Sequence, residues 1–363
     1  MNASSNRQTA RELPCRTASP ADGLAVSAIP AEAHPLRVVA LGGGTGLSTL
    51  LRGLRRHVVA PGIDPAPAQI SDLAVVVTVT DDGGSSGRLR RGFNMLPPGD
   101  LRNCMVALSE EEDLLVKLFS HRFRSGGALK GHNLGNLFVA ALTEVTGDFA
   151  LAIQLASKIL ATRGSIYPAT TANTTLVAYM DDGSVVRGET NITASKRRIV
   201  ELTLDPPDPV PLPETLHAIN HADLITVGPG SLYTSLITNL LIEGVSAALA
   251  KARGLRVYIC NLMTQAHESL GLTASEHIER IYDHARAPIF DYAIVNTSPF
   301  SKQTIERYAA ESAAPIVADI DRIEKLGVKC IAGNFASEDS VVRHATGRLA
   351  SALLELGRTA ARR

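Results

Sequence analysis

From residue 36 onward, short continuous apolar runs alternate with segments whose apolar residues recur at helical spacing. The run LRVVAL at 36–41 predicts a buried strand, and LSTLLRGLRR at 47–56 predicts an amphipathic helix. The same alternation predicts further strands at 73–80, 256–260 and 291–295, and further helices at 100–119, 276–284 and 303–311. This order predicts an α/β fold that is Rossmann-like, with a mainly parallel sheet and helices on both faces.

Two segments depart from this alternation. Residues 1–35 are rich in Ala, Ser, Pro and Arg and have no periodicity, which predicts a disordered N-terminal extension. At about 172–204, two alternating runs flank the turn sequence Asp181-Asp182-Gly183, which predicts an antiparallel β-hairpin insertion. We expect the remainder, 36–363, to form a single α/β domain that carries this insertion.

Composition narrows the classes of function. The chain has 363 residues, of which 45% are hydrophobic and 20% are charged, as in ordinary globular proteins. Its formal net charge is zero and it has no Trp, so neither a broad basic surface nor a stacking platform for nucleic acid is expected. The four cysteines form no C-x-x-C pair, and no apolar run reaches the ~18 residues of a membrane span. We expect a cytoplasmic protein that binds neither nucleic acid nor membrane.

A glycine-rich loop follows the first predicted strand. Gly42-Gly43-Gly44-Thr45-Gly46 stands between strand and helix, where small residues let the backbone approach a phosphate and helix amides point toward it. Thr49 breaks the dinucleotide fingerprint and Leu47-Ser48 breaks the Walker A pattern. The loop therefore indicates either an anion site, with Gly43, Gly44, Thr45 and Gly46 as its candidates, or a tight turn alone.

An acidic doublet follows the second strand. Asp81 and Asp82 are expected at the carboxyl edge of the sheet, where two carboxylates can hold Mg²⁺, accept ribose hydroxyls or move a proton. Behind them, Ser85 and Ser86 lie in a glycine-rich nest and Arg88 adds a cation suited to phosphate. A solvated turn is the alternative. Farther on, Asp100 is predicted to be the N-cap of the helix that runs to about Phe119.

Two later segments add candidates. Gly228-Pro229-Gly230-Ser231 repeats the strand, loop, helix arrangement, so Gly228, Gly230 and Ser231 are binding candidates, although Ser231 could simply cap its helix. Asn133 and Asn136 lie one turn apart at the start of an apolar helix and are either caps or substrate contacts. No G-x-S-x-G elbow supports hydrolase chemistry.

Several of these motifs in order resemble a known family. The segments VVALGGGTGLSTLLRGL, VTVTDDGGSSGRLR, LPPGDLRNCMVALS, ADLITVGPGSLYTS and VRHATGRLASALL resemble the YvcK-type gluconeogenesis factors, a family similar to the 2-phospho-L-lactate transferase CofD. The resemblance implies a Rossmann-like cytoplasmic protein needed for growth and normal cell shape on gluconeogenic carbon sources, with UDP-sugars as ligands. It also implies that Tyr308 and Arg343 contact the UDP-sugar.

The chain also departs from the family pattern. After Gln265 it has Ala266-His267-Glu268-Ser269 where the family usually has Pro-Gly-Glu-Thr, which changes the expected loop. Two functions stay open: a UDP-sugar-binding factor without turnover, or a Mg²⁺-dependent transferase that uses Asp81 and Asp82 to move a phospho-organic acid to a deazaflavin-like acceptor. A homo-oligomer and regulatory protein partners are further expectations, and the residues specify neither.

Overall fold

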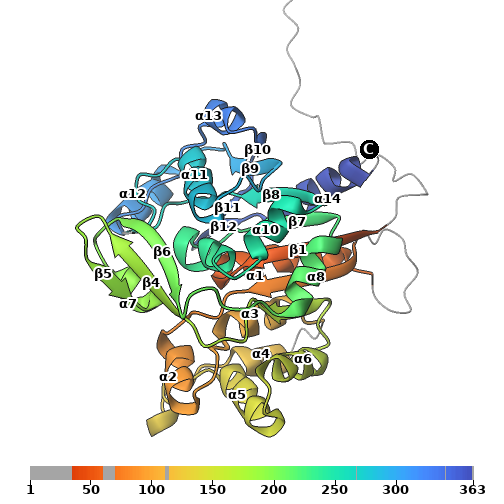
Figure 1. Cartoon of the computed structure of the whole chain (residues 1–363), viewed down its shortest axis with the longest axis vertical. Coiled ribbons are helices and arrows are strands. Elements are labelled where there is room, and N and C mark those ends of the chain that lie inside the picture. Colours follow the sequence, from red (N-terminus) through yellow and green to blue (C-terminus); the bar gives the residue numbers. More distant parts are fainter. Residues whose placement is uncertain (1–34, 60–69, 111–113, 267, 340, 362–363) are drawn as a thin grey trace, which may run out of the picture. The chain divides into compact units, whose positions relative to one another are not determined.

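A seven-stranded parallel sheet organises the protein, whose computed structural model describes residues 35–59, 70–110, 114–266, 268–339 and 341–361 (Figure 1). The strand order is β10-β9-β8-β7-β1-β2-β3, and all neighbours run parallel. The strands are β1 Leu36–Gly42, β2 Ile70–Val77, β3 Ser165–Pro168, β7 Leu224–Val227, β8 Leu255–Ile259, β9 Tyr292–Asn296 and β10 Lys329–Gly333. The predicted α/β fold with a mainly parallel sheet is confirmed.

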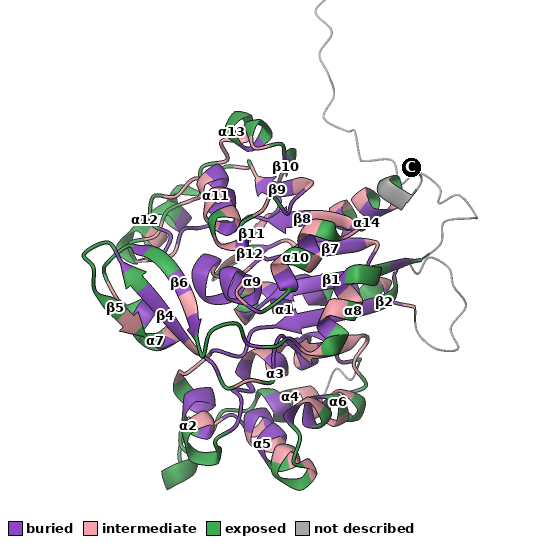
Figure 2. Ribbon diagram, in the orientation of Figure 1, coloured by how far each residue is buried: buried purple, intermediate pink, exposed green. Residues whose placement is uncertain are grey.

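Both faces of the central strands are buried, which is why these strands read as continuous apolar runs (Figure 2). In β1, Val38 and Ala40 point into one hydrophobic cluster, while Val39 and Leu41 point into the other. This alternation follows from the two-residue period of a strand. Each face therefore needs its own layer of helices.

The helices form these two layers. One cluster draws its helical residues from α1 Gly44–Leu54, α2 Gly84–Phe93, α3 Gly99–Leu108, α4 Leu114–Ser120, α5 Leu134–Thr146, α6 Phe149–Ile159 and α14 Thr346–Ala361. The other draws them from α7 Glu189–Ala194, α8 Pro213–His221, the π-helix η3 Leu232–Ile237, α9 Thr238–Leu240, α10 Val245–Lys251, α11 Ala274–Ala285 and α13 Ile320–Lys325. The remaining elements are α12 Lys302–Ala310, the short 3₁₀ turns Arg55–His57 and Gly127–Leu129, and a two-stranded antiparallel pair, β11 Ala336–Glu338 and β12 Val342–His344.

The predicted antiparallel insertion is present and has a third strand. β4 Thr175–Met180 pairs with β5 Val185–Arg187 across the predicted turn, and β6 Ile199–Asp205 pairs with the other edge of β4. Leu176 and Leu202 are buried in the cluster that η3 and α11 also enter. The insertion thus shares a core with the main sheet. Most of the predicted N-terminal extension, residues 1–34, lies outside the described residues.

Two boundary predictions are wrong. Asp100 is not an N-cap, because α3 begins at Gly99 with Pro98 in the cap position. The helix also ends at Leu108 rather than near Phe119, and Phe119 belongs to the separate helix α4. The carboxylate of Asp100 is instead used by a residue distant in the chain, as described below.

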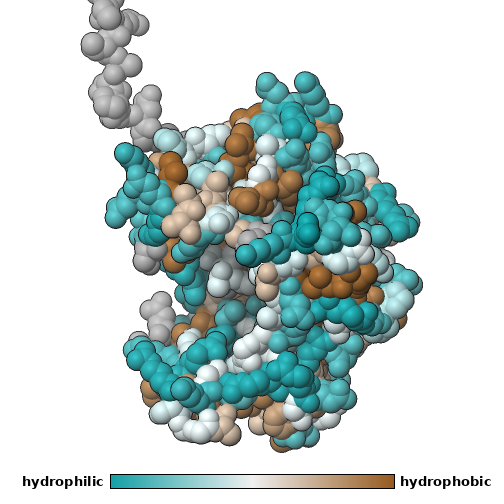
Figure 3. Space-filling view, turned by 90° about the vertical axis from the view of Figure 1, so that its left-hand side faces the viewer, coloured by the Kyte–Doolittle hydropathy of each residue, from teal (hydrophilic) through white to brown (hydrophobic). Residues whose placement is uncertain are grey.

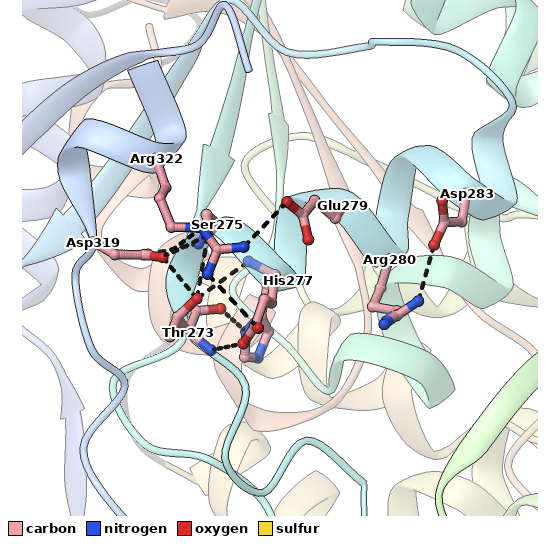
Figure 4. A network of polar contacts seen from close by, with 9 residues as sticks. Thr273, Ser275, His277, Glu279, Arg280, Asp283, Asp319 and Arg322 are labelled. Carbon is pink, nitrogen blue, oxygen red and sulfur yellow. Dashed lines mark hydrogen bonds and ion pairs between the residues drawn. The ribbon is translucent and has the colours of Figure 1, made fainter. Parts of the chain in front are cut away.

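A polar network fixes the start of α11 against α13 (Figure 4). Thr273 forms a capping box with Glu276, in which each side chain bonds the other residue's backbone N–H. The Asp319 carboxylate accepts hydrogen bonds from Thr273 Oγ1 at 2.8 Å and from the Ser275 N–H at 2.9 Å. Although partial burial opposes ionisation, these bonds hold the pKa of Asp319 below its ordinary value.

Within the described ranges, no single helix is both long and apolar enough to cross a membrane. One sharply bent pair, Leu232–Leu240 with Val245–Lys251, meets the length and composition criteria only when joined. The large apolar side chains of that pair, such as Leu236 and Leu249, are buried in the hydrophobic core.

Candidate functional site

The strand order of the sheet reverses between β1 and β7. From β1 the chain proceeds outward through β2 and β3, and from β7 it proceeds the other way through β8, β9 and β10. Leu41 pairs with Val227, so the two strands end level with each other. Open α/β sheets bind ligands at such a switch point, beyond the carboxyl ends of the strands. Both predicted glycine loops begin there.

The two glycine loops are in direct contact. A Cβ added to Gly46 would lie 2.6 Å from the Pro229 carbonyl oxygen, and one added to Gly230 would lie 3.3 Å from the Gly43 oxygen. Gly228 has a φ of +93°, and an added Cβ would lie 2.8 Å from the Ile259 oxygen. Glycine at positions 46 and 230 therefore lets the two loops approach each other, and glycine at position 228 lets the second loop pass close to the end of β8.

The first loop is also tied to α3. The Gly44 N–H donates to Asp100 Oδ2 at 2.8 Å, so one amide at the start of α1 is already satisfied from within the protein. Burial raises the pKa of Asp100 to about 6; Asp81 adds to the rise, whereas the Gly44 hydrogen bond and Arg102 oppose it. When it is ionised, the Asp100 carboxylate places a negative charge next to this loop and disfavours the binding of an anion there. An anionic ligand therefore needs a cation from elsewhere in the site.

The loops form one wall of a cleft with a volume of about 280 Å³. We call this site the glycine cleft. Its lining comprises Gly43, Gly44, Thr45, Gly46, Thr49, Pro229, Gly230, Ser231, residues 261–265, Tyr308 and residues 341–344. Gly228 directly precedes the lining residues of the second loop. The cleft thus brings together both predicted loops and the two residues that the family resemblance added, Tyr308 and Arg343.

The segment after β8 supports the second loop. Gln265 Nε2 donates to Ser231 Oγ at 2.9 Å, and Ser231 makes no side-chain cap to η3. The cap is supplied by Glu268, whose Oε1 accepts from the Tyr233 and Thr234 N–H groups at 2.9 and 3.1 Å. Burial raises the pKa of Glu268 while these bonds oppose the rise. Glu268 belongs to the atypical Ala266–Ser269 segment, of which His267 lies outside the described residues.

The opposite wall comes from α12 and β12. Tyr308 Oη accepts a hydrogen bond from the Val342 N–H at 3.0 Å, which fixes the phenol beside Arg343. Arg343 is exposed, and its side chain has neither an ion pair nor a hydrogen bond to another described residue. His344 Nε2 lies 3.1 Å from the Cys260 oxygen, and burial lowers the pKa of His344 to about 4, so this histidine is neutral near pH 7. Arg343 is therefore the cation that the cleft offers.

The remaining candidates lie outside the lining of the cleft. Asn133 Oδ1 accepts from the Asn136 N–H at 3.2 Å, so Asn133 caps α5, one of the two roles predicted for it. Asn136 Nδ2 lies 3.5 Å from Ser86 Oγ, and Ser85 Oγ lies 3.1 Å from His132 Nδ1. These residues and Arg88, whose charge acts on His132, form a second polar group that does not line the cleft.

The acidic doublet points toward the insertion and its own turn. Asp82 Oδ1 accepts from the Thr190 N–H at 2.9 Å and from Thr190 Oγ1 at 2.6 Å, while Asp81 Oδ1 accepts from the Gly83 N–H at 2.9 Å. Over the part of the chain that the structure describes, no three His, Cys, Asp or Glu side chains are arranged to hold a metal ion. The Mg²⁺ site on Asp81 and Asp82 stays a prediction, and this donor set does not favour it.

Sequence reasoning missed a third acid beside this doublet. Glu189 begins α7, and its Oε2 accepts from Thr80 Oγ1 at 3.3 Å. Burial raises the pKa of Glu189 well above its ordinary value, and repulsion from Asp81 and Asp100 adds to the rise. No local pattern indicates this contact, because the insertion carries Glu189 back to the sheet edge from far along the chain.

Comparison with known proteins agrees with this architecture. The family model described as 2-phospho-L-lactate transferase CofD matches residues 38–336. The chain belongs to the CofD family. Within the family, this chain is 46% identical over 319 residues to the gluconeogenesis factor of Halalkalibacterium halodurans. The matched region covers 88% of this chain and 95% of that protein. It is 43% identical over 321 residues to the gluconeogenesis factor of Bacillus subtilis, covering 88% and 98% of the two chains.

Solved structures agree as well. The crystal structure of a UPF0052 family protein from Bacillus halodurans superimposes on this CofD family member with a TM-score of 0.83 at 44% identity, covering 88% of this chain and 99% of the other. The resemblance to the gluconeogenesis factors, and through them to CofD, is confirmed by these matches.

Proposed function

We propose that this protein is a cytoplasmic factor that binds a UDP-sugar in the glycine cleft and supports growth and normal cell shape under gluconeogenic conditions. The gluconeogenic part of the proposal is supported by the names of its relatives from Halalkalibacterium halodurans and Bacillus subtilis. The ligand class is supported by the chemistry of the cleft.

One observation carries the ligand proposal. Two glycine loops from the switch point of the sheet, Tyr308 and Arg343 all line the same cleft. A guanidinium can bind a diphosphate with two parallel hydrogen bonds, and Arg343 has no competing carboxylate partner among the described residues. The Tyr308 hydroxyl accepts from the backbone and still has its own hydrogen to donate to a sugar or base.

The transferase alternative has less support. It needs Asp81 and Asp82 at the ligand, whereas these carboxylates bond to Gly83 and Thr190 and do not line the cleft. The closely similar relatives are named as gluconeogenesis factors, although the family model carries the name of a transferase.

Calorimetric titration with UDP-N-acetylglucosamine tests the proposal. We expect saturable binding, weakened about 10-fold to 100-fold in Arg343→Gln, since a hydrogen bond to a charged group contributes about 1.5–3 kcal/mol. Lys302→Gln is the matched control, because it removes one positive charge from α12, the helix that carries Tyr308, at a side chain that is 91% exposed and only loosely paired with Glu306 at 3.8 Å. A product assay on the same samples should show no consumption of ligand.

Two outcomes would contradict the proposal. Absence of binding heat for every UDP-sugar tested would remove the ligand class. Unchanged affinity in Arg343→Gln would place the ligand outside the glycine cleft. The physiological part has a separate test: a deletion strain should lose growth and normal shape on gluconeogenic carbon sources, and the wild-type gene should restore both.

A further inference from the structure

Three arginines from separate elements meet near the start of α5. Arg88 lies on α2, Arg102 lies on α3, and Arg122 follows α4. We call these residues the arginine cluster. Figure 3 views the molecule from the side on which α2 lies in Figure 1, and the lower part of that face, at the height of α2, is largely hydrophilic.

Gly131 brings two of the guanidinium groups together. Arg122 Nη1 donates to the Gly131 carbonyl oxygen at 2.8 Å. A Cβ added to Gly131 would lie 3.2 Å from Arg88 Nη2, so the guanidinium of Arg88 reaches the same turn. Gly131 has a φ of +81°, a conformation that favours glycine. The turn between α4 and α5 is therefore in close contact with the guanidinium groups of Arg88 and Arg122.

Arg102 adds the third cation at the first turn of α5. Its Nε donates to Asn136 Oδ1 at 3.1 Å, and its aliphatic stem packs on Gly135, where an added Cβ would lie 2.8 Å from Arg102 Cδ. Burial and the charge of Arg122 together lower the pKa of Arg102 to about 10. The two guanidinium groups are therefore close enough to repel each other.

No carboxylate forms an ion pair with the cluster. None of the three arginines lies within 4.0 Å of an acidic oxygen in the described part of the chain, although Asp100 attracts Arg102 from farther away. Elsewhere the protein does pair its arginines closely, as in Arg37–Asp223 at 2.8 Å and Arg256–Asp291 at 2.6 Å. Cations gathered in this way without an ion-paired carboxylate repel one another, and a bound anion would relieve that repulsion.

Neutral hydrogen-bonding groups complete the surroundings. The Asn133 N–H donates to Ser85 Oγ at 3.2 Å, which leaves the Ser85 hydroxyl hydrogen free for His132 Nδ1 at 3.1 Å. In the tautomer in which Ser85 is the donor, neutral His132 carries its hydrogen on Nε2, where it is available to a ligand. Burial, with Arg88 and Arg122 nearby, lowers the pKa of His132, in keeping with a strongly positive environment.

We propose that Arg88, Arg102 and Arg122, together with His132, form a second ligand site that binds the phosphate group of a phosphorylated small molecule. A phosphate dianion offers several acceptor oxygens to three planar guanidinium groups, which can each donate two parallel hydrogen bonds. None of these four residues lines the glycine cleft, so the site is separate from the one proposed for the UDP-sugar.

The test uses the full chain at low ionic strength. Inorganic phosphate and glycerol 3-phosphate are titrated into wild type and into the double variant Arg88→Gln/Arg122→Gln, whose two exposed side chains leave the core intact. We expect phosphate affinity to fall at least tenfold in the double variant. Arg91→Gln, an exposed arginine on the same helix α2, should bind like wild type. Tighter binding of glycerol 3-phosphate than of free phosphate would identify an organic phosphate as the ligand, and the reverse would identify phosphate itself.

Arg343→Gln separates this proposal from the previous one. We expect it to bind phosphate like wild type whether or not the protein binds UDP-N-acetylglucosamine, so each proposal can fail alone. Equal phosphate binding by wild type and the double variant would overturn the second site. Loss of phosphate binding in Arg343→Gln instead would place the anion in the glycine cleft, and an equal loss in Arg91→Gln would show a diffuse charge effect. Far-UV circular dichroism of each variant checks that it is folded.

Discussion

At Gly46, the absence of a side chain decides how closely the two cleft loops meet. The space beside its Cα is filled by the Pro229 carbonyl group, which is backbone and cannot move away as a flexible side chain would. Any side chain at this position must push the second loop away from the first. The geometry of the cleft therefore depends on one residue type at one position.

Gly46→Ala should both destabilise the protein and weaken ligand binding. We expect a loss of about 1–3 kcal/mol in the free energy of unfolding, the usual cost of overpacking, measured by urea denaturation. Gly92→Ala is the control, because an added Cβ there meets no atom within 4 Å. That change should be neutral or stabilise by up to about 1 kcal/mol. Equal stability of the two variants would show that the loops separate without cost.

Asp100 opposes anion binding at the same loop, and its pKa of about 6 makes the effect depend on pH. A bound diphosphate would disfavour the ionised carboxylate, so binding should be coupled to proton uptake. Affinity for UDP-N-acetylglucosamine should therefore rise as the pH falls from 8 toward 6. About threefold is expected, because a repulsion of ~1 kcal/mol between like charges corresponds to a factor of about five, and a carboxyl group with a pKa of about 6 is only half protonated at pH 6.

Asp100→Asn removes this charge and keeps an oxygen that can accept from the Gly44 N–H. At pH 8 the variant should bind more tightly than wild type, and between pH 6 and 8 its affinity should be nearly constant. Calorimetry in two buffers of different ionisation enthalpy measures the proton uptake directly. A wild-type affinity that falls on acidification would show that another group controls binding.

At the scale of elements, local pattern predicted much of the fold and part of the site. The run ending at Gly42 and the strand before Gly228 were predictable because a buried parallel strand is apolar on both faces and a glycine loop follows each. The use of Asp100 was not predictable, since an acid near a helix start fits the N-cap pattern equally well and its partner Gly44 is far away in the chain. The arginine cluster likewise combines three elements that no short motif connects.

Helix α11 shows how such long-range bonds hold an element in place. Asp319 joins the first turn of α11 through Thr273 Oγ1, the Ser275 N–H and the Ser275 hydroxyl, at distances of 2.8, 2.9 and 2.5 Å. Asp319→Ala should therefore lower the free energy of unfolding by roughly 2–4 kcal/mol, because it leaves these donors without their acceptor. Thermal and urea denaturation provide the measurement.

Asp283→Ala is the matched control on α11 itself. Asp283 pairs with Arg280 at 3.1 Å on an exposed surface, and such pairs contribute little (Figure 4). We expect a change within about 0.5 kcal/mol. A comparable loss in both variants would mean that the Asp319 network does not anchor the helix.

For the whole molecule, the question is whether the insertion unfolds with the main sheet. β6 and β4 place Leu202, Leu204 and Leu176 in the cluster that also contains residues of η3, α10 and α11. Leu202 is only 1% exposed, and its N–H donates to His284 Nε2 of α11 at 3.2 Å. A shared core of this kind predicts a single cooperative transition for the described unit.

Leu202→Ala should then destabilise the whole unit, by about 2–5 kcal/mol from the lost contacts and the cavity. Since the chain has no Trp, Tyr179→Trp on the exposed side of β4 supplies a fluorescence signal from the insertion alone, while far-UV circular dichroism follows the helices. Both signals should shift together in Leu202→Ala. Val200→Ala changes an exposed position of β6, the strand that also carries Leu202. In this variant, the free energy of unfolding from either signal should change by no more than about 0.5 kcal/mol. If the fluorescence transition came first, the insertion would be a separate folding unit, and its contact with α11 would contribute little to the stability of the sheet that carries the glycine cleft.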